Sequence, residues 1–264
     1  MTGVVWKIAR SQMRDAVRSR WLTVYTLFFL AVSEGLIRFS GVDEKAILSL
    51  ATVALMVVPL VTLVLSTIYV YNAREFTELL LAQPVKRTSL FAGLYLGLTV
   101  PLAAGFVGGI ALPFLVRGGA EPGQRAALVT LLAVGALLTF VFTALAFLVA
   151  LRADDRLRGL GISLGVWLLF GVVYDGIVLI AVALLGDYSI ERPLLAVTMA
   201  NPVDLARVLL MLKLDVAALM GYTGAVFQKF FGGAGGAALA GSALLAWVAV
   251  PVALSLRQFR RKDF

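Results

Sequence analysis

Residues 46–71 read AILSLATVALMVVPLVTLVLSTIYVY, a run of 26 positions without a charged side chain. As an α-helix the run rises about 39 Å, which exceeds the roughly 30 Å hydrocarbon core of a bilayer and leaves room for tilt. Only a helix or a closed barrel satisfies its own backbone hydrogen bonds in lipid, because no water is present there. The run therefore predicts a membrane-spanning helix.

Similar apolar runs recur along the rest of the chain, so that the predicted spans are residues 21–37, 46–71, 90–116, 126–151, 160–185 and 234–256. The chain is 61% hydrophobic and 14% charged, and its mean hydropathy of +0.97 is typical of a protein that has lipid as its solvent. We expect an all-α integral membrane protein with six transmembrane helices. A single transmembrane domain, 1–264, divides into a surface helix (1–20), spans one to five (21–185), an extracytoplasmic segment (186–233), the sixth span (234–256) and a tail (257–264).

Orientation follows from the basic residues, which gather on one side of the predicted spans. Fifteen of the 23 lie in the termini and in the second and fourth connectors: Lys7, Arg10, Arg14, Arg18, Arg20, Arg74, Lys86, Arg87, Arg152, Arg156, Arg158, Arg257, Arg260, Arg261 and Lys262. Because short loops rich in Lys and Arg stay in the cytoplasm, both termini are expected to be cytoplasmic in a multi-pass protein of the cytoplasmic (inner) membrane. Orientation in membrane lipid thus accounts for the net charge of +8 without nucleic acid as a partner.

The residue types that are missing narrow the chemistry. The chain has no Cys and no His, which excludes disulfides, thiolate metal sites and the commonest general base. Gly161-Ile-Ser-Leu-Gly165 matches the nucleophile elbow of serine hydrolases, but that site requires a His partner. No Walker phosphate loop is present, so any ATP must bind a partner protein. We therefore predict that the chain is not an enzyme and has no catalytic residue, cofactor or metal of its own.

Small residues four positions apart allow helices to approach closely in a membrane. Within the predicted spans three glycine pairs have this spacing: Gly93 with Gly97, Gly105 with Gly109, and Gly161 with Gly165. We expect all three pairs to pack against neighbouring helices.

The N-terminal segment 4–20 has the pattern of an amphipathic helix. Basic side chains recur at three- or four-residue spacing, and apolar side chains take the other side. The basic set is Lys7, Arg10, Arg14 and Arg18, and the apolar set is Val5, Ala9, Met13, Ala16 and Val17. Such a helix is expected to lie on the membrane surface.

The cytoplasmic connector 72–88 is longer than a turn requires. Phe76, Leu79 and Leu80 form one face of a short predicted helix, and Pro84 ends it because proline cannot continue the hydrogen-bond pattern. The connector is therefore predicted to carry a short cytoplasmic helix.

The extracytoplasmic segment 186–233 carries the signals of another helix. Asn201 is a predicted N-cap, Pro202 takes the first helical position, and Asp204 lies in the first turn. Some 48 residues exceed what a simple connector needs, so we expect a docking surface here.

Asp175, beside Tyr174, lies deep inside the fifth predicted span, about 22 Å along a straight helix from its cytoplasmic end. A carboxylate there is costly, so it should face a dimer interior or a wet cavity. Two interpretations stay open. Asp175 and Tyr174 line a transport pathway, or Asp175 is protonated or hydrogen-bonded to a neighbouring helix in a structural role.

The stretch Glu78-Leu-Leu-Leu-Ala-Gln-Pro84-Val-Lys-Arg87 resembles the connector of ABC-2 type transporter permeases, although Arg-Glu-Phe-Thr stands before Glu78 where that family has Gly-Thr-Leu. In the family this connector docks into a groove of a cytoplasmic ATPase subunit. The resemblance implies that residues 74–84 are the coupling helix. The residues it assigns to ATPase coupling are Arg74, Glu75, Phe76, Glu78, Leu79, Leu80 and Pro84.

Residues 159–175, 200–207 and 218–227 resemble, more narrowly, the permeases of the transporter that matures nitrous oxide reductase. This resemblance implies a homodimer bound to a dimer of ATPase subunits, which hold ATP and Mg, and to an extracytoplasmic solenoid-type protein. It also implies a role in assembling the copper-sulfur centre of the reductase, with a sulfur species as a compatible cargo. The expected docking residues are Asn201, Pro202, Asp204 and Arg207. The alternatives are an ABC-2 exporter of another small molecule or lipid, and a membrane scaffold that transports nothing.

Overall fold

The computed structural model describes residues 2–41, 43–119, 122–185, 191–214, 230 and 234–262, and every regular element in these ranges is a helix. Six helical stretches are long and apolar enough to cross a membrane: Arg20–Ser40, Glu44–Asn72, Arg87–Val116, Gly123–Arg152, Arg156–Ile180 and Ala238–Arg261. The predicted all-α architecture with six spans is confirmed.

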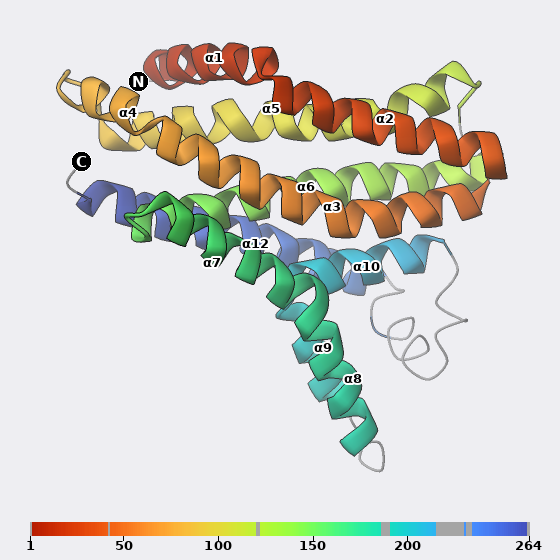
Figure 1. Ribbon diagram of the computed structural model, residues 1–264. Helices are drawn as coiled ribbons and strands as arrows, with labels where there is room; N and C mark the ends of the chain where they lie inside the picture. The colour runs from red at the N-terminus through yellow and green to blue at the C-terminus, as the bar shows by residue number, and fades with distance from the viewer. Residues whose placement is uncertain are drawn as a thin grey trace.

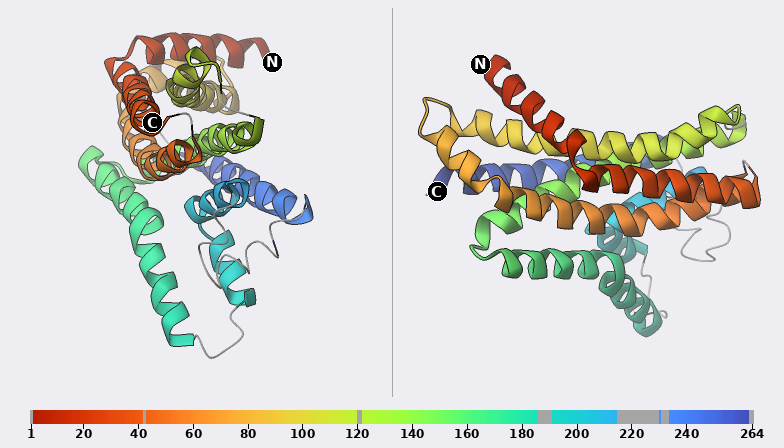
Figure 2. Two further views of the ribbon diagram at one scale, coloured as in Figure 1. Left: turned by 90° about the vertical axis from the view of Figure 1, so that its right-hand side faces the viewer. Right: turned by 45° about the horizontal axis from the view of Figure 1, so that its top comes forward.

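The elements are α1 (Thr2–Arg18), α2 (Arg20–Ser40), α3 (Glu44–Asn72), α4 (Arg74–Leu81), α5 (Arg87–Val116), α6 (Pro122–Arg152), α7 (Arg156–Leu168), the π turn η1 (Leu169–Val173), α8 (Tyr174–Leu185), α9 (Glu191–Met199), α10 (Pro202–Lys213) and α12 (Ala234–Arg261). Helices α2, α3, α5, α6 and α12 run side by side as a bundle (Figures 1 and 2). Both termini and α4 lie at the same end of it (Figure 1). We call this the basic end, because most of the Lys and Arg residues belong to its segments.

The centre of the bundle is formed by α5 and α6, with α2 packed on α5 and α3 packed on α6. Phe29 and Phe106 meet edge to face in this core, with ring centroids 5.0 Å apart. Helices in lipid are held together by close packing and by interhelical hydrogen bonds. One such bond joins the Tyr95 hydroxyl to the Phe140 carbonyl at 2.9 Å.

Two glycine pairs on α5 bring helices together as predicted. A Cβ added at Gly93 would lie 2.6 Å from Cγ2 of Ile8 on α1, and one added at Gly109 would lie 2.8 Å from Cβ of Phe29 on α2. Their partners, Gly97 and Gly105, meet the same two helices. Any side chain at these positions would push α1 or α2 away.

The third pair behaves differently from the prediction. An added Cβ at Gly161 or Gly165 would meet nothing within 4 Å. The two glycines of α7 therefore pack no helix within the part of the chain that the structure describes.

Helix α1 lies across α5 and buries Ile8, Ala9, Gln12 and Ala16 against the bundle. The predicted apolar side shares Ala9 and Ala16 with this stripe, but Val17 is 61% exposed. The buried face is rotated because the glycines of α5, rather than the apolar pattern of α1, decide where the two helices touch. Whether α1 lies on a membrane surface stays a prediction.

The fifth predicted span is bent. After α7, the N–H of Tyr174 bonds to the carbonyl of Leu169, five residues earlier, and this π turn inserts an extra residue into the helix. Helix α8 then leaves the bundle (Figures 1 and 2). The predicted depth of Asp175 assumed a straight helix, and rise along the chain does not measure depth beyond this turn.

The predicted helix at residue 202 is present as α10, and Asn201 caps it by accepting a hydrogen bond from the Val203 N–H at 2.9 Å. One face of α10 packs against α6, α12 and α3. This part of the 186–233 segment therefore belongs to the bundle. Residues 186–190, 215–229 and 231–233, which include the 218–227 stretch, lie outside the described residues.

Candidate functional site

Helix α4 presents an exposed surface with apolar and acidic side chains at the basic end. Leu79 is 70% exposed and Phe76 is 38% exposed. The acidic residues Glu75 and Glu78 flank them and are also exposed. All four residues lie outside the candidate membrane-spanning stretches. Adjacent large apolar side chains left open to water are typical of a protein-docking surface.

The opposite face of α4 attaches it to the bundle. Thr77 is buried, and its hydroxyl donates to the Ala73 carbonyl at 2.8 Å. Leu80 is partly buried and packs on the main core. The predicted apolar face is thus divided, with Phe76 and Leu79 outward and Leu80 inward, and the helix ends at Leu81, before Pro84.

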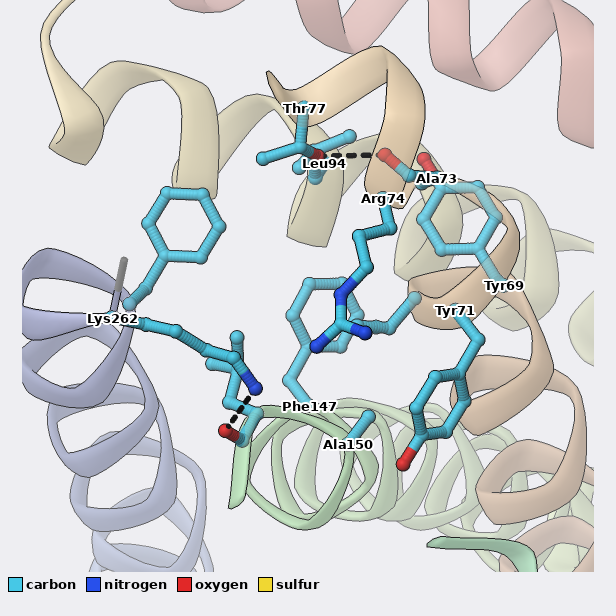
Figure 3. A pocket seen from close by; sticks show the side chains of 12 residues that line it. Tyr69, Tyr71, Ala73, Arg74, Thr77, Leu94, Phe147, Ala150 and Lys262 are labelled. Atoms are coloured by element: carbon cyan, nitrogen blue, oxygen red, sulfur yellow. Dashed lines mark hydrogen bonds between the residues drawn. The ribbon is translucent and has the colours of Figure 1, made fainter. Parts of the chain in front are cut away.

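Asp154, in the turn between α6 and α7, joins α4 to the C-terminal tail. Its Oδ1 lies 3.1 Å from Nζ of Lys262 and 3.8 Å from Nη2 of Arg74. The hydrogen bond from Lys262 and the nearby positive charges hold the pKa of Asp154 below its usual range. Arg74 and Lys262 line a cavity of about 20 Å³, which has room for about one water molecule (Figure 3).

Further contacts link the same segments. The Tyr71 hydroxyl donates to the Ala153 carbonyl at 2.8 Å. Nη1 of Arg87 donates to the carbonyls of Arg260 at 3.0 Å and Lys262 at 2.8 Å. The α6–α7 turn thus contacts the start of α4 and the ends of α3 and α12, and the start of α5 contacts the end of α12.

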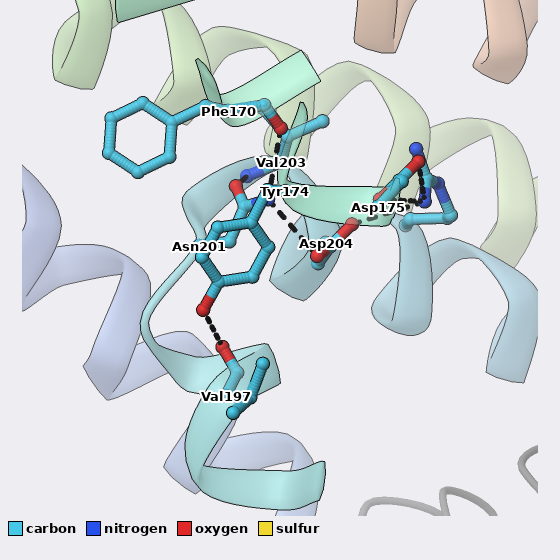
Figure 4. Close-up of polar contacts among 8 residues, drawn as sticks. Phe170, Tyr174, Asp175, Val197, Asn201, Val203 and Asp204 are labelled. Carbon is cyan, nitrogen blue, oxygen red and sulfur yellow. Dashed lines mark hydrogen bonds and ion pairs between the residues drawn. The ribbon is translucent and has the colours of Figure 1, made fainter. Parts of the chain in front are cut away.

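A second cluster lies where α8 leaves the bundle beside α10 (Figure 4). Nη1 of Arg207 lies 2.8 Å from Oδ2 of Asp175 on α8 and 3.1 Å from Oδ1 of Asp204 on α10. The guanidinium of Arg207 thus forms ion pairs with both carboxylates. A charge taken out of water requires such a partner, because the desolvation of an unpaired ion is costly.

The neutral side chains of this cluster, Asn201 and Tyr174, donate hydrogen bonds to backbone carbonyls of neighbouring helices. The Asn201 amide donates to the carbonyl of Phe170, inside the π turn, at 2.9 Å and to Oδ2 of Asp204 at 3.0 Å. The Tyr174 hydroxyl donates to the Val197 carbonyl of α9 at 2.6 Å. The Val197 carbonyl also accepts a hydrogen bond from the Ala200 N–H at 3.0 Å, so two donors share this acceptor near the end of α9.

Asp204 is buried, and its burial raises its pKa to about 7. The neighbouring Asp175 carboxylate adds to the shift, whereas Arg207 and Asn201 oppose it. Asp204 therefore titrates near neutral pH. Beside it, a cavity of about 110 Å³ is lined by Arg207 together with apolar and thioether side chains.

Comparison with known proteins gives these features a context. The ABC-2 family transporter protein profile matches residues 52–264. The chain belongs to the ABC-2 transporter family. It is similar to the probable ABC transporter permease protein NosY of Stutzerimonas stutzeri, with 29% identity over 98% of each chain. It is also similar to the protein of the same description in Pseudomonas aeruginosa, with 29% identity over 83% of this chain and 85% of the relative.

In this ABC-2 permease, the structure supplies a partner for Asp175 that sequence reasoning missed. Arg207 lies 32 residues further along the chain, on a helix predicted to be external. The sequence shows an isolated acidic residue in a predicted span and a basic residue on a predicted external helix. Their separation along the chain does not indicate that the two residues are in contact. Tyr174 points to α9 rather than to the Asp175–Arg207 pair.

The four predicted docking residues of the permease face its own interior. Asn201, Pro202 and Asp204 are buried, and 30% of the Arg207 side chain is exposed. They build the α8–α10 contact. Docking of an extracytoplasmic partner on this segment stays a prediction.

Proposed function

We propose that this chain is the membrane-spanning permease of an ATP-driven transporter needed to assemble the copper-sulfur centre of nitrous oxide reductase. The observation that carries the proposal is the similarity to NosY over 98% of both chains. The proposed cargo is a sulfur species. ATP and Mg would bind a separate ATPase, in keeping with the absence of a Walker loop from the sequence.

We assign ATPase coupling to α4. Its exposed Phe76 and Leu79 offer apolar side chains for a groove on the partner, and Glu75 and Glu78 offer charges at the rim. Arg74 begins the helix and contacts Asp154, which also contacts Lys262. In this proposal, a displacement of α4 is transmitted through these contacts to α6, α7 and α12. In this proposal two copies of the chain bind two ATPase subunits at the cytoplasmic side and a solenoid-type protein at the opposite side.

We assign a structural role to Asp175. Its pairing with Arg207 gives the carboxylate the neighbouring-helix partner that this interpretation requires. Asp175→Asn is then expected to leave maturation of the reductase intact, since the amide keeps the shape and one oxygen that can accept from Arg207. Loss of maturation with normal amounts of assembled complex would instead support a pathway role for Asp175 and Tyr174.

Complementation tests the proposed function. The gene is expressed in a denitrifying host that lacks its own NosY, and nitrous oxide consumption is measured together with the visible spectrum of the purified reductase. We expect restored consumption and a loaded copper-sulfur centre. A chain that inserts and binds an ATPase but restores neither would point to an exporter of another small molecule or lipid. One that binds partners without stimulating ATP hydrolysis would point to a scaffold.

A further inference from the structure

An apolar groove runs between the first half of α2 and the middle of α3. Two helical stripes line it: Trp21, Val24, Tyr25 and Phe28 on α2, and Val57, Leu60, Val61, Val64 and Leu65 on α3. The spacing in each stripe is three or four residues, which puts its members on one face of the helix. The groove has a volume of about 500 Å³ and is open to the outside of the bundle. It exists because α2 packs chiefly on α5 and α3 chiefly on α6.

The groove continues into a polar cavity toward the basic end. Trp21 and Leu65 line both spaces, and the second space, of about 200 Å³, also has Asp15, Ser19 and Tyr69 in its wall. The nine residues from Val57 to Leu65 cover about 12 Å of helix. The combined space is therefore apolar over a length comparable to most of one lipid tail and polar at one end.

The polar end lies at the break between α1 and α2. Ser19 is extended there and its side chain caps no amide, so the first N–H groups of α2 lack helical partners. Arg18 and Arg20 flank the break with exposed side chains and form no ion pair with any residue that the structure describes. Asp15 reduces the positive charge of this junction without cancelling it.

We propose that this groove is a binding site for an anionic phospholipid. One acyl chain lies between the α2 and α3 stripes, and the phosphate lies at the α1–α2 break against Arg18, Arg20 and the first amides of α2. Trp21 sits between the two parts, in the position that indole rings favour at the edge of a bilayer. The site does not depend on the proposed role in enzyme maturation.

Charge favours an anionic lipid in this groove, because Arg18 and Arg20 outnumber Asp15 and leave the junction with a net positive charge. An anionic headgroup has the complementary charge. Two arginines favour it over a neutral headgroup by up to about 30-fold in occupancy.

The test uses the full chain in lipid nanodiscs and the fluorescence of Trp21, taken as the difference between the wild type and Trp21→Phe. The probes are phosphatidylglycerol and phosphatidylcholine with brominated acyl chains, each at the same low fraction in unlabelled phosphatidylcholine. We expect brominated phosphatidylglycerol to quench Trp21 more strongly. The preference should disappear in Arg18→Gln/Arg20→Gln and persist in Arg10→Gln/Arg14→Gln, which removes the same charge from exposed positions of α1 outside the groove.

Val61→Phe should fill the groove and reduce the phospholipid retained on the purified chain in native mass spectrometry. Val100→Phe, at a partly exposed position of α5 outside the groove, should not. Equal quenching by both brominated lipids would overturn the proposal. It would show that the lipid next to Trp21 is not selected for its headgroup charge. Efficient crosslinking between copies at Val61→Cys would also overturn it, because the chain has no other Cys and the groove would then hold a second copy.

Discussion

Arg207 is the residue on which the contact between α8 and α10 depends, because its guanidinium serves both Asp175 and Asp204. Arg207→Gln is expected to cost about 1–3 kcal/mol, between the values for an exposed and for a buried ion pair, since these side chains are partly exposed. Thermal unfolding of the purified protein in detergent measures the loss. Asp175→Asn/Arg207→Gln should lose less than the two single changes together. Strict additivity would contradict a direct interaction.

Asp204 gives this contact a pH dependence. Its pKa of about 7 in the folded protein lies above the ordinary value for Asp, so the folded state holds the proton more tightly than the unfolded state between these two pKa values. Stability from this group is present at low pH and is lost as pH rises through about 7. We expect the melting temperature to fall by about 5 °C between pH 5 and pH 8. Asp204→Asn should flatten this dependence, and an unchanged slope would show that another group titrates.

At the level of elements, the α1–α5 contact depends on glycine. A Cβ at Gly97 would clash with Gln12 of α1, whereas one at Gly108 on the same helix would meet nothing within 4 Å. Gly97→Val is expected to cost about 1–3 kcal/mol through overpacking, and Gly108→Val much less. Thermal unfolding and protease access to α1 report the difference. Equal effects of the two changes would contradict close packing of α1 on α5.

The spans could be predicted because apolar runs of bilayer length are unambiguous, and α10 could be predicted because Asn201 and Pro202 are strong local start signals. The π turn at residues 169–173 could not, since nothing in an apolar helical run marks where one residue is inserted. The face that α1 buries was predicted only in part, because it is set by glycines about 90 residues away. The Asp175–Arg207 pair required knowing that α10 folds back onto the bundle.

For the whole molecule, the grouping of both termini with α4 at one end agrees with the distribution of basic residues (Figure 1). Tags at residue 2 and residue 264 are expected to be cytoplasmic, and a tag in the 186–233 segment is expected on the opposite side. Protease protection in intact right-side-out vesicles measures this. Cleavage of either terminal tag from outside would contradict the predicted orientation. It would show that α4 lies on the side opposite a cytoplasmic ATPase.

Helix α4 is the proposed contact between the membrane bundle and the ATPase. Substitutions on its surface therefore test the proposed complex directly. Leu79→Asp places a charge on the exposed face, and Leu80→Pro breaks the helix at a cost of about 3 kcal/mol. Thr88→Asp adds the same charge at an exposed position outside residues 74–84 and serves as the control.

The decisive measurement is the composition of the complex that co-purifies with the tagged chain from native membranes in mild detergent. We predict that the wild type and Thr88→Asp retain an ABC ATPase, whereas Leu79→Asp and Leu80→Pro lose it while remaining inserted in the membrane. Undiminished ATPase on both α4 variants, or no ATPase on the wild type, would contradict the assignment of α4 as the coupling helix of an ABC-2 permease.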